Sequence, residues 1–278
     1  MVFLCLAILS SATISLLMRI SAGKIRAKLS MLGFNYLICA LLGAAYAGFD
    51  LLRPDIPGFP FTVGLGVLSG ILYLSGFVLF QWNTANNGVV LTSVFMKLGL
   101  LVPMVLSVLV FHEMPTWAQI AGFGIAILAI VVLNFHQKGE KGQFRWQLVV
   151  MLLMCGGSDA MSKVFKFWGP DVLSNQFLFY TFAVALVLCA ALVLLKKERP
   201  GIREFLFGAA IGIPNFFSSK FLLLALADLP AVVVFPSFSI ATMLITTLVG
   251  VLFFKERLHK LQWLALSAII AALLLLNI

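Results

Sequence analysis

The sequence has 278 residues, of which 62% are hydrophobic and 10% are charged, and its mean hydropathy is +1.12. Too few polar side chains remain to coat a soluble globule of this size, so a water-soluble fold is excluded and the bilayer must be the solvent. The formal net charge of +9 does not indicate a nucleic-acid partner, because most basic residues lie in short links between apolar runs, where they set topology and contact membrane lipids.

Apolar runs bounded by charge, proline or glycine predict ten transmembrane helices. A hydrocarbon core about 30 Å thick requires roughly 20 apolar residues per helix, and lipid cannot satisfy the open edge of a sheet. The first run lacks a basic segment and a cleavage site, so we expect it to be a retained span. The predicted spans are 2–18, 29–48, 60–81, 88–110, 116–135, 146–165, 172–195, 204–226, 230–253 and 258–277.

An internal repeat organises these spans. The segment FHEMPTWAQ at 111–119 is echoed by FKERLHKLQ at 254–262, and the separation of 143 residues between Glu113 and Glu256 also relates Phe95 to Phe238. The chain is therefore predicted to be two homologous halves, 1–138 and 139–278. Because each half has five spans, the halves have opposite orientations, which favours alternating access around a site between them. The expected fold class is an all-α membrane protein with ten helices in two inverted five-helix repeats.

Basic residues predict the orientation. One face retains Arg53, Lys163 and Lys166, and the richer face is expected to be cytoplasmic, which places both termini outside an inner (plasma) membrane protein. The richer face carries Arg19, Lys24, Arg26, Lys28, Lys138, Lys141, Arg145, Lys196, Lys197, Arg199, Arg203, Lys255, Arg257 and Lys260.

The duplicated glutamate in the turn after the fourth span of each half, Glu113 and Glu256, is accompanied by fourth spans that carry Pro103 and Pro236. On these features the chain resembles the ten-span drug/metabolite transporter superfamily, EamA type, over essentially its whole length. The resemblance implies an inner-membrane permease for metabolites or drugs with a central cavity between the halves, driven by an ion gradient or by exchange. Small four-span relatives use a glutamate in their first span; the corresponding spans here have none, so their cation/proton antiport is not carried over.

Lys97 lies near the middle of the run 88–110. Ten residues of helix rise about 15 Å and a lysine side chain reaches about 6 Å, so its amine cannot reach water by snorkelling. A charge facing lipid there costs at least about 2.5 kcal/mol, which favours a wet cavity, a carboxylate partner or a solute as its neighbour. The alternative is a neutral or carbonyl-satisfied lysine between helices.

Asp159 follows two glycines in the span 146–165, and Lys163 is one turn further on. The pair could neutralise itself, since an acid four residues before a base is the favourable order on a helix. Alternatively, Asp159 is the carboxylate that couples a proton or sodium ion. The glycines permit either close helix approach or a break in the helix.

Further polar residues in apolar runs are candidates for contact with a solute. Lys220 is near enough to a span end to be a surface anchor, and for the Ser and Thr side chains ordinary hydrogen bonds between helices are the alternative. The candidates are Tyr73, Gln176, Asn215 and Lys220, with Ser237 and Ser239 after Pro236. Glu113 and Glu256 are expected to cap the helices that follow them and, with Pro103 and Pro236, to be structural.

No nucleophile with a neighbouring base, phosphate-binding glycine loop or metal-ligand spacing occurs, so we expect neither an enzyme nor a cofactor or metal. The leading hypothesis is a secondary transporter for a small anionic or zwitterionic solute such as an amino acid. Its cavity would be lined by spans 1, 3, 4, 6, 8 and 9, and it would be a monomer or a homodimer. The alternatives are a multidrug exporter of amphipathic compounds, a lipid-carrier flippase and a membrane scaffold that transports nothing.

Overall fold

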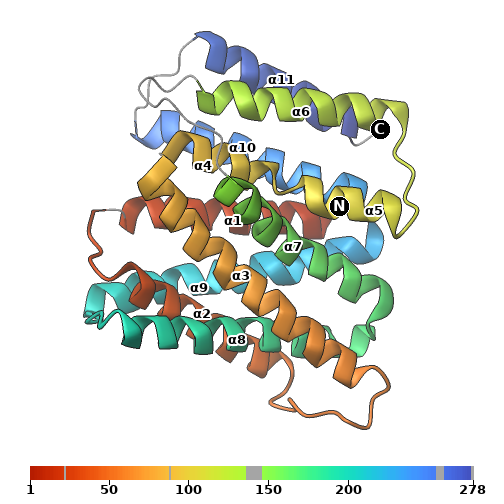
Figure 1. Cartoon of the computed structure of the whole chain (residues 1–278). Coiled ribbons are helices and arrows are strands. Elements are labelled where there is room, and N and C mark those ends of the chain that lie inside the picture. Colours follow the sequence, from red (N-terminus) through yellow and green to blue (C-terminus); the bar gives the residue numbers. More distant parts are fainter. Residues whose placement is uncertain (22, 88, 136–145, 255–259, 277–278) are drawn as a thin grey trace. The chain divides into compact units, whose positions relative to one another are not determined.

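The computed structural model describes residues 1–21, 23–87, 89–135, 146–254 and 260–276 (Figure 1). Throughout these ranges the regular secondary structure is helical, as the composition predicts. The α-helices are α1 (Val2–Ser21), α2 (Lys28–Tyr46), α3 (Phe59–Asn87), α4 (Val89–Leu98), α5 (Leu101–Leu109), α6 (Trp117–Phe135), α7 (Trp146–Trp168), α8 (Ser174–Leu195), α9 (Ile202–Asp228), α10 (Ala231–Phe254) and α11 (Lys260–Leu276), and a short 3₁₀ helix, η1, covers Asp171–Leu173.

Each predicted span coincides with a helical segment. By length and composition, seven of the described helices are able to cross a membrane: α1, α2, α3, α7, α8, α9 and α10. Shorter apolar helices cover Phe95–Leu109 and Trp117–Ala129. The chain is thus a multi-pass helical membrane protein, while ten crossings and the inverted orientation of the halves stay predictions.

Helical contacts divide the chain into two compact units. Unit 1 comprises 1–74 and 161–227, and unit 2 comprises 75–160 and 228–278. Each unit therefore takes residues from both predicted halves, and α3 and α7 each run from one unit into the other. The division 1–138 and 139–278 remains a statement about the sequence repeat.

Unit 1 is built on the contact between α2 and α8, which lie side by side (Figure 1). At its centre the ring of Tyr36 is fully buried, with the rings of Tyr73 and Phe182 at 5.8 and 6.5 Å between centroids. Glycine allows α9 to approach α2 closely, since a Cβ on Gly208 would lie 2.5 Å from the carbonyl oxygen of Met31. In lipid, helix association has no hydrophobic driving force and depends on van der Waals packing, and small residues allow the close approach that this packing requires.

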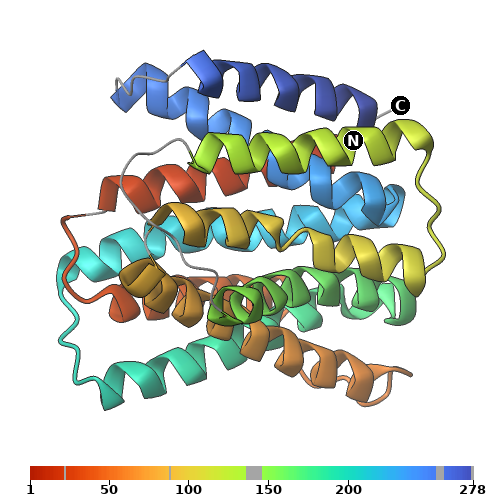
Figure 2. The same ribbon diagram turned by 45° about the horizontal axis from the view of Figure 1, so that its top comes forward.

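Unit 2 is built on the contact between α6 and α11, which run side by side in Figures 1 and 2. Their interface also receives side chains from α10 and from Leu100, the residue before α5. Gly122 of α6 brings the helices together, because a Cβ there would lie 3.0 Å from the carbonyl oxygen of Ala272. The buried cluster consists of Leu100, Ala126, Ala129, Ile240, Met243, Ala272 and Leu276.

The span predicted at 88–110 is not one regular helix, which corrects the sequence-based expectation. The α-helical pattern stops between α4 and α5, where the Gly99 N–H donates to Met96 O at 3.2 Å and the Leu100 N–H donates to Lys97 O at 3.4 Å, both three residues back. Pro103 contributes to the break because it lacks the N–H that would bond Gly99 O; Val102 N–H bonds that oxygen instead, at 3.0 Å.

Candidate functional site

The break between α4 and α5 positions Lys97. This lysine lies in the last turn of α4 and is half-buried. In a regular α-helix the Val102 N–H would bond the carbonyl oxygen of Leu98. Here it bonds Gly99 O instead, so the Leu98 carbonyl lacks this partner. Both the Leu98 carbonyl and the negative end of the helix dipole favour a cation at this end of α4. The sequence pattern located Lys97 in the span but not the helix end that accommodates it.

Asp159 of α7 is the acidic group whose charge acts on Lys97. The two groups belong to unit 2 and interact electrostatically, and Asp159 is also half-buried. A carboxylate partner was one of the three surroundings expected for Lys97, and a direct ion pair between the two groups stays a prediction. Lys163, the other proposed partner of Asp159, is buried one turn further along α7, with 7% of its surface exposed. The Asp159–Lys163 pair stays a prediction.

A glycine contact brings α7 to the break. The backbones of Gly156 and Gly99 meet, so that a Cβ on Gly99 would lie 3.3 Å from the nitrogen of Gly156. Helix α7 continues unbroken from Trp146 to Trp168, so of the two roles expected for its glycines the structure shows close approach. Asp159 follows Gly156 by three residues and therefore shares its helix face, which directs the carboxylate towards the side of α4.

A second polar cluster lies inside unit 1. Tyr73 Oη donates to Asn215 Oδ1 at 2.9 Å, and Asn215 Nδ2 donates to Asn35 Oδ1 at 3.1 Å. Both asparagines are buried, with 3% and 6% of Asn35 and Asn215 exposed. The sequence predicted Tyr73 and Asn215 but missed Asn35. Its signal was available, because Asn35 is an isolated polar residue in the apolar run 29–48.

Gln176 forms a hydrogen bond with the link between α2 and α3. Its Nε2 donates to the carbonyl oxygen of Asp50 at 3.0 Å, and Tyr180 Oη donates to that of Leu51 at 2.9 Å, so α8 holds the α2–α3 link. In the same link Arg53 pairs with Asp50 at 2.7 Å. The hydrogen bond that Arg53 donates to Asp55, together with the charge of Asp50, raises the pKa of Arg53, so this guanidinium stays charged.

Lys220 lies against aromatic rings. Its Nζ is 3.2 Å from the centroid of the Tyr46 ring and 5.9 Å from that of Phe216. Such contacts stabilise an ammonium without a carboxylate partner. Two residues before Lys220, Ser218 Oγ donates to the carbonyl oxygen of Ala7 at 3.3 Å, which is the helix-to-helix bonding expected as an alternative to a site role.

Helix α10 contains an internal proline and several hydroxyl side chains. Pro236 lies inside this helix, so the carbonyl of Val232 lacks its usual N–H partner. Ser237 is buried, Ser239 is half-buried, and Thr242 has a buried hydroxyl without a hydrogen-bond partner among the described residues. Pro103 is buried in α5.

Glu113 bonds a different helix from the one predicted. Its Oε2 accepts a hydrogen bond from Val232 N–H at 3.2 Å, in the first turn of α10. Helix α6, which follows Glu113, begins instead with a capping box in which Thr116 N–H donates to Gln119 Oε1 and Gln119 N–H donates to Thr116 Oγ1. Glu256, its sequence counterpart, lies outside the described residues.

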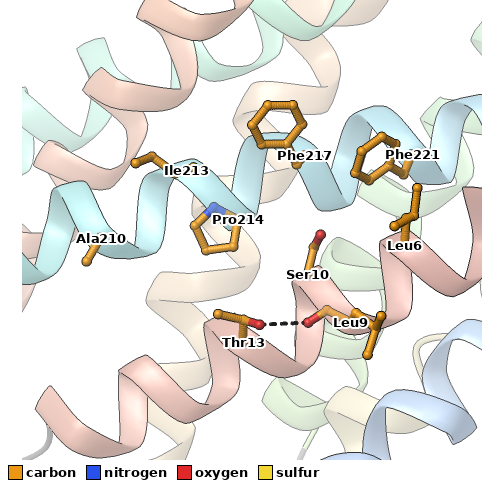
Figure 3. A pocket seen from close by; sticks show the side chains of 9 residues that line it. All are labelled: Leu6, Leu9, Ser10, Thr13, Ala210, Ile213, Pro214, Phe217 and Phe221. Carbon is orange, nitrogen blue, oxygen red and sulfur yellow. Dashed lines mark hydrogen bonds between the residues drawn. The ribbon is translucent and has the colours of Figure 1, made fainter.

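An open groove of about 500 Å³ runs between α1 and α9 within unit 1 (Figure 3). Spans 1 and 8, which form it, were both expected to line a cavity. Ser10 and Pro214 point into it from opposite sides, and Thr13 bonds its own helix at Leu9 O. The lining is otherwise apolar and comprises Leu6, Leu9, Ala210, Ile213, Phe217 and Phe221.

Comparisons with known proteins bear on the whole chain. The profile of the EamA-like transporter family matches residues 1–135 and 146–278. A protein of Haemophilus influenzae, described only as uncharacterized, is 26% identical over 288 residues that cover 96% of this chain and 94% of the relative. One protein of known crystal structure, 18% identical, superimposes with a TM-score of 0.76 over 99% of this chain and 94% of that chain, which shows a shared fold.

Proposed function

Because the chain belongs to the EamA-like transporter family, within the drug/metabolite transporter superfamily, we propose that it is a secondary active transporter of a small organic solute. The solute carries a carboxylate, and an amino acid or another zwitterionic metabolite fits best. It crosses the inner membrane by alternating access, in a protein whose two termini lie outside.

The observation that carries this proposal is the Lys97–Asp159 pair beside a helix break. A zwitterion presents one carboxylate and one ammonium, so Lys97 can bind the first group and Asp159 the second. When the solute binds, Lys97 and Asp159 exchange each other for the two charged groups of the solute, so no charge is left unmatched. An unmatched charge at this depth would cost at least about 2.5 kcal/mol. In an alternative arrangement, Asp159 binds the coupling proton or sodium ion and not the ammonium of the solute.

A second function, export of amphipathic drugs, is favoured by the groove between α1 and α9. A concave, mostly apolar space of about 500 Å³ is of the size that encloses a small molecule. Such a ligand would bind through Phe217 and Phe221 and would require no fixed charge. The two functions therefore differ in their dependence on Lys97.

The test begins with a thermal-shift panel of solutes on purified protein, followed by flux of the best stabiliser into proteoliposomes under imposed pH or sodium gradients. We expect Lys97→Met to abolish flux of the carboxylate-bearing solute and Lys97→Arg to retain part of it. Lys166→Met is the matched control, because this lysine pairs with the exposed Asp171 in a link. Full solute flux in Lys97→Met would refute the proposal, and loss of drug flux confined to Phe217→Ala would favour the second function.

A further inference from the structure

Two neighbouring links of unit 1 carry a concentration of positive charge, here termed the basic surface. One link joins α1 to α2 and the other joins α8 to α9. All eight side chains are exposed, and together they form one of the largest accumulations of like charge in the sequence. The basic surface consists of Arg19, Lys24, Arg26, Lys28, Lys196, Lys197, Arg199 and Arg203.

Hydrogen bonds between the links make the basic surface a single feature. Glu204 Oε1 accepts from the backbone N–H groups of Arg26 and Ala27 at 3.2 and 3.4 Å, and its Oε2 accepts from Gly201 N–H at 3.1 Å. Glu198 Oε2 accepts from the N–H and the hydroxyl of Ser30 at 2.9 and 3.0 Å. The α8–α9 link is thereby fastened to the start of α2.

The same bonds direct the two carboxylates of this region towards backbone N–H groups and away from the exposed basic side chains. Glu198 and Glu204 are the acidic residues of these two links, and both carboxylates cap the N-terminal turn of α2, which favours negative charge. Glu204 is only 7% exposed. The outward face is consequently cationic, although the sequence of its second link alternates basic and acidic residues.

We propose that the basic surface binds the phosphodiester headgroups of anionic phospholipids. Lysine and arginine side chains pair with phosphate oxygens, arginine in a bidentate manner. The adjoining helices α1, α2, α8 and α9 are apolar and long enough to cross a membrane, so a lipid headgroup at their ends would be held next to the cations. In the orientation proposed above, the surface faces the cytoplasmic leaflet, where anionic lipids are concentrated.

The test uses the full-length protein in nanodiscs of neutral phosphatidylcholine into which phosphatidylglycerol is titrated, with thermal stability and lipid retention in native mass spectrometry as readouts. The double variant Lys197→Gln/Arg199→Gln removes two cations of the basic surface, and Arg53→Gln/Lys166→Gln removes two from elsewhere in unit 1, one in the α2–α3 link and one in the last turn of α7. Each cation near an anionic surface strengthens binding about fivefold, so the first variant should bind phosphatidylglycerol about 25-fold more weakly and the second nearly normally. Neither readout involves transport, so the proposed function can fail independently.

A second experiment distinguishes a lipid headgroup from a soluble phosphate ester as the ligand: soluble glycerol phosphate is added to the protein in neutral nanodiscs. We expect no stabilisation by this free headgroup, and stabilisation equal to that by the lipid would overturn the lipid proposal in favour of a soluble phosphate ester. Equal loss of lipid binding in the two double variants would also overturn it. To separate folding from binding, Glu204→Gln should lower the thermal stability in neutral and anionic nanodiscs alike.

Discussion

Gly156 of α7 and Gly99 at the end of α4 are in backbone contact. A Cβ on Gly156 would overlap the carbonyl oxygen of Gly99 and lie 2.8 Å from the Cβ of Val102. No side chain separates the two backbones, so the position of α7 and the break between α4 and α5 depend on each other. Lys97 and Asp159 each lie within one turn of this contact, the first on α4 and the second on α7.

Replacement of Gly156 by alanine should therefore destabilise the protein. The new methyl group meets backbone atoms, which cannot rotate away, and overpacking of this kind costs about 1–3 kcal/mol. Gly124→Ala on α6 is the matched control, because nothing lies within 4 Å of its added Cβ, and it should be neutral or stabilising by up to about 1 kcal/mol. Thermal unfolding in one detergent measures both. Equal unfolding temperatures for the two variants would contradict the contact.

Asn215 should be the most sensitive position of the polar cluster in unit 1. Its replacement by leucine removes the acceptor of the Tyr73 hydroxyl and the amide donor to Asn35 Oδ1, which keeps only the weaker contact with Cys39 Sγ at 3.8 Å, and loss of such a bond costs about 1–3 kcal/mol. Tyr73→Phe breaks one bond and should cost less than Asn215→Leu. A double-mutant cycle for Tyr73 and Asn215 should give a coupling of about 0.5–1.5 kcal/mol. Strict additivity would show that the bond contributes nothing.

Sequence patterns identify the helices of this protein better than they identify the partners of its polar groups. Apolar runs predict the helices because lipid requires a continuous apolar surface over each span. The partners of Asn35 and Glu113 lie 180 and 119 residues away, so local patterns name the polar residue but not what it bonds. The break at Gly99 was missed for a related reason, since it depends on Gly156 of another helix as well as on Pro103.

Glu113 should protect the start of α10, and not that of α6, from hydrogen exchange. In Glu113→Ala the Val232 N–H loses its acceptor, and loss of a helix cap costs about 0.5–2 kcal/mol. Amide exchange measured by mass spectrometry should accelerate in the first turn of α10. In Thr116→Ala, which removes the capping box of α6, it should accelerate around Gln119 instead. Faster exchange at α6 in the Glu113 variant would restore the assignment made from sequence.

The Lys97–Asp159 pair should be separable into a structural and a transport role by three variants. Removal of one partner leaves the other charge, which is half-buried, without its counter-charge, so Lys97→Met and Asp159→Leu should each lose about 1–3 kcal/mol of stability. The double variant Lys97→Met/Asp159→Leu removes both charges, and apolar replacement of two opposite charges inside a protein is often neutral or stabilising, so it should unfold near the wild-type temperature. The same double variant should still fail to transport the carboxylate-bearing solute, because both groups that would bind it are gone. A stable double variant with wild-type flux would assign the pair to folding alone.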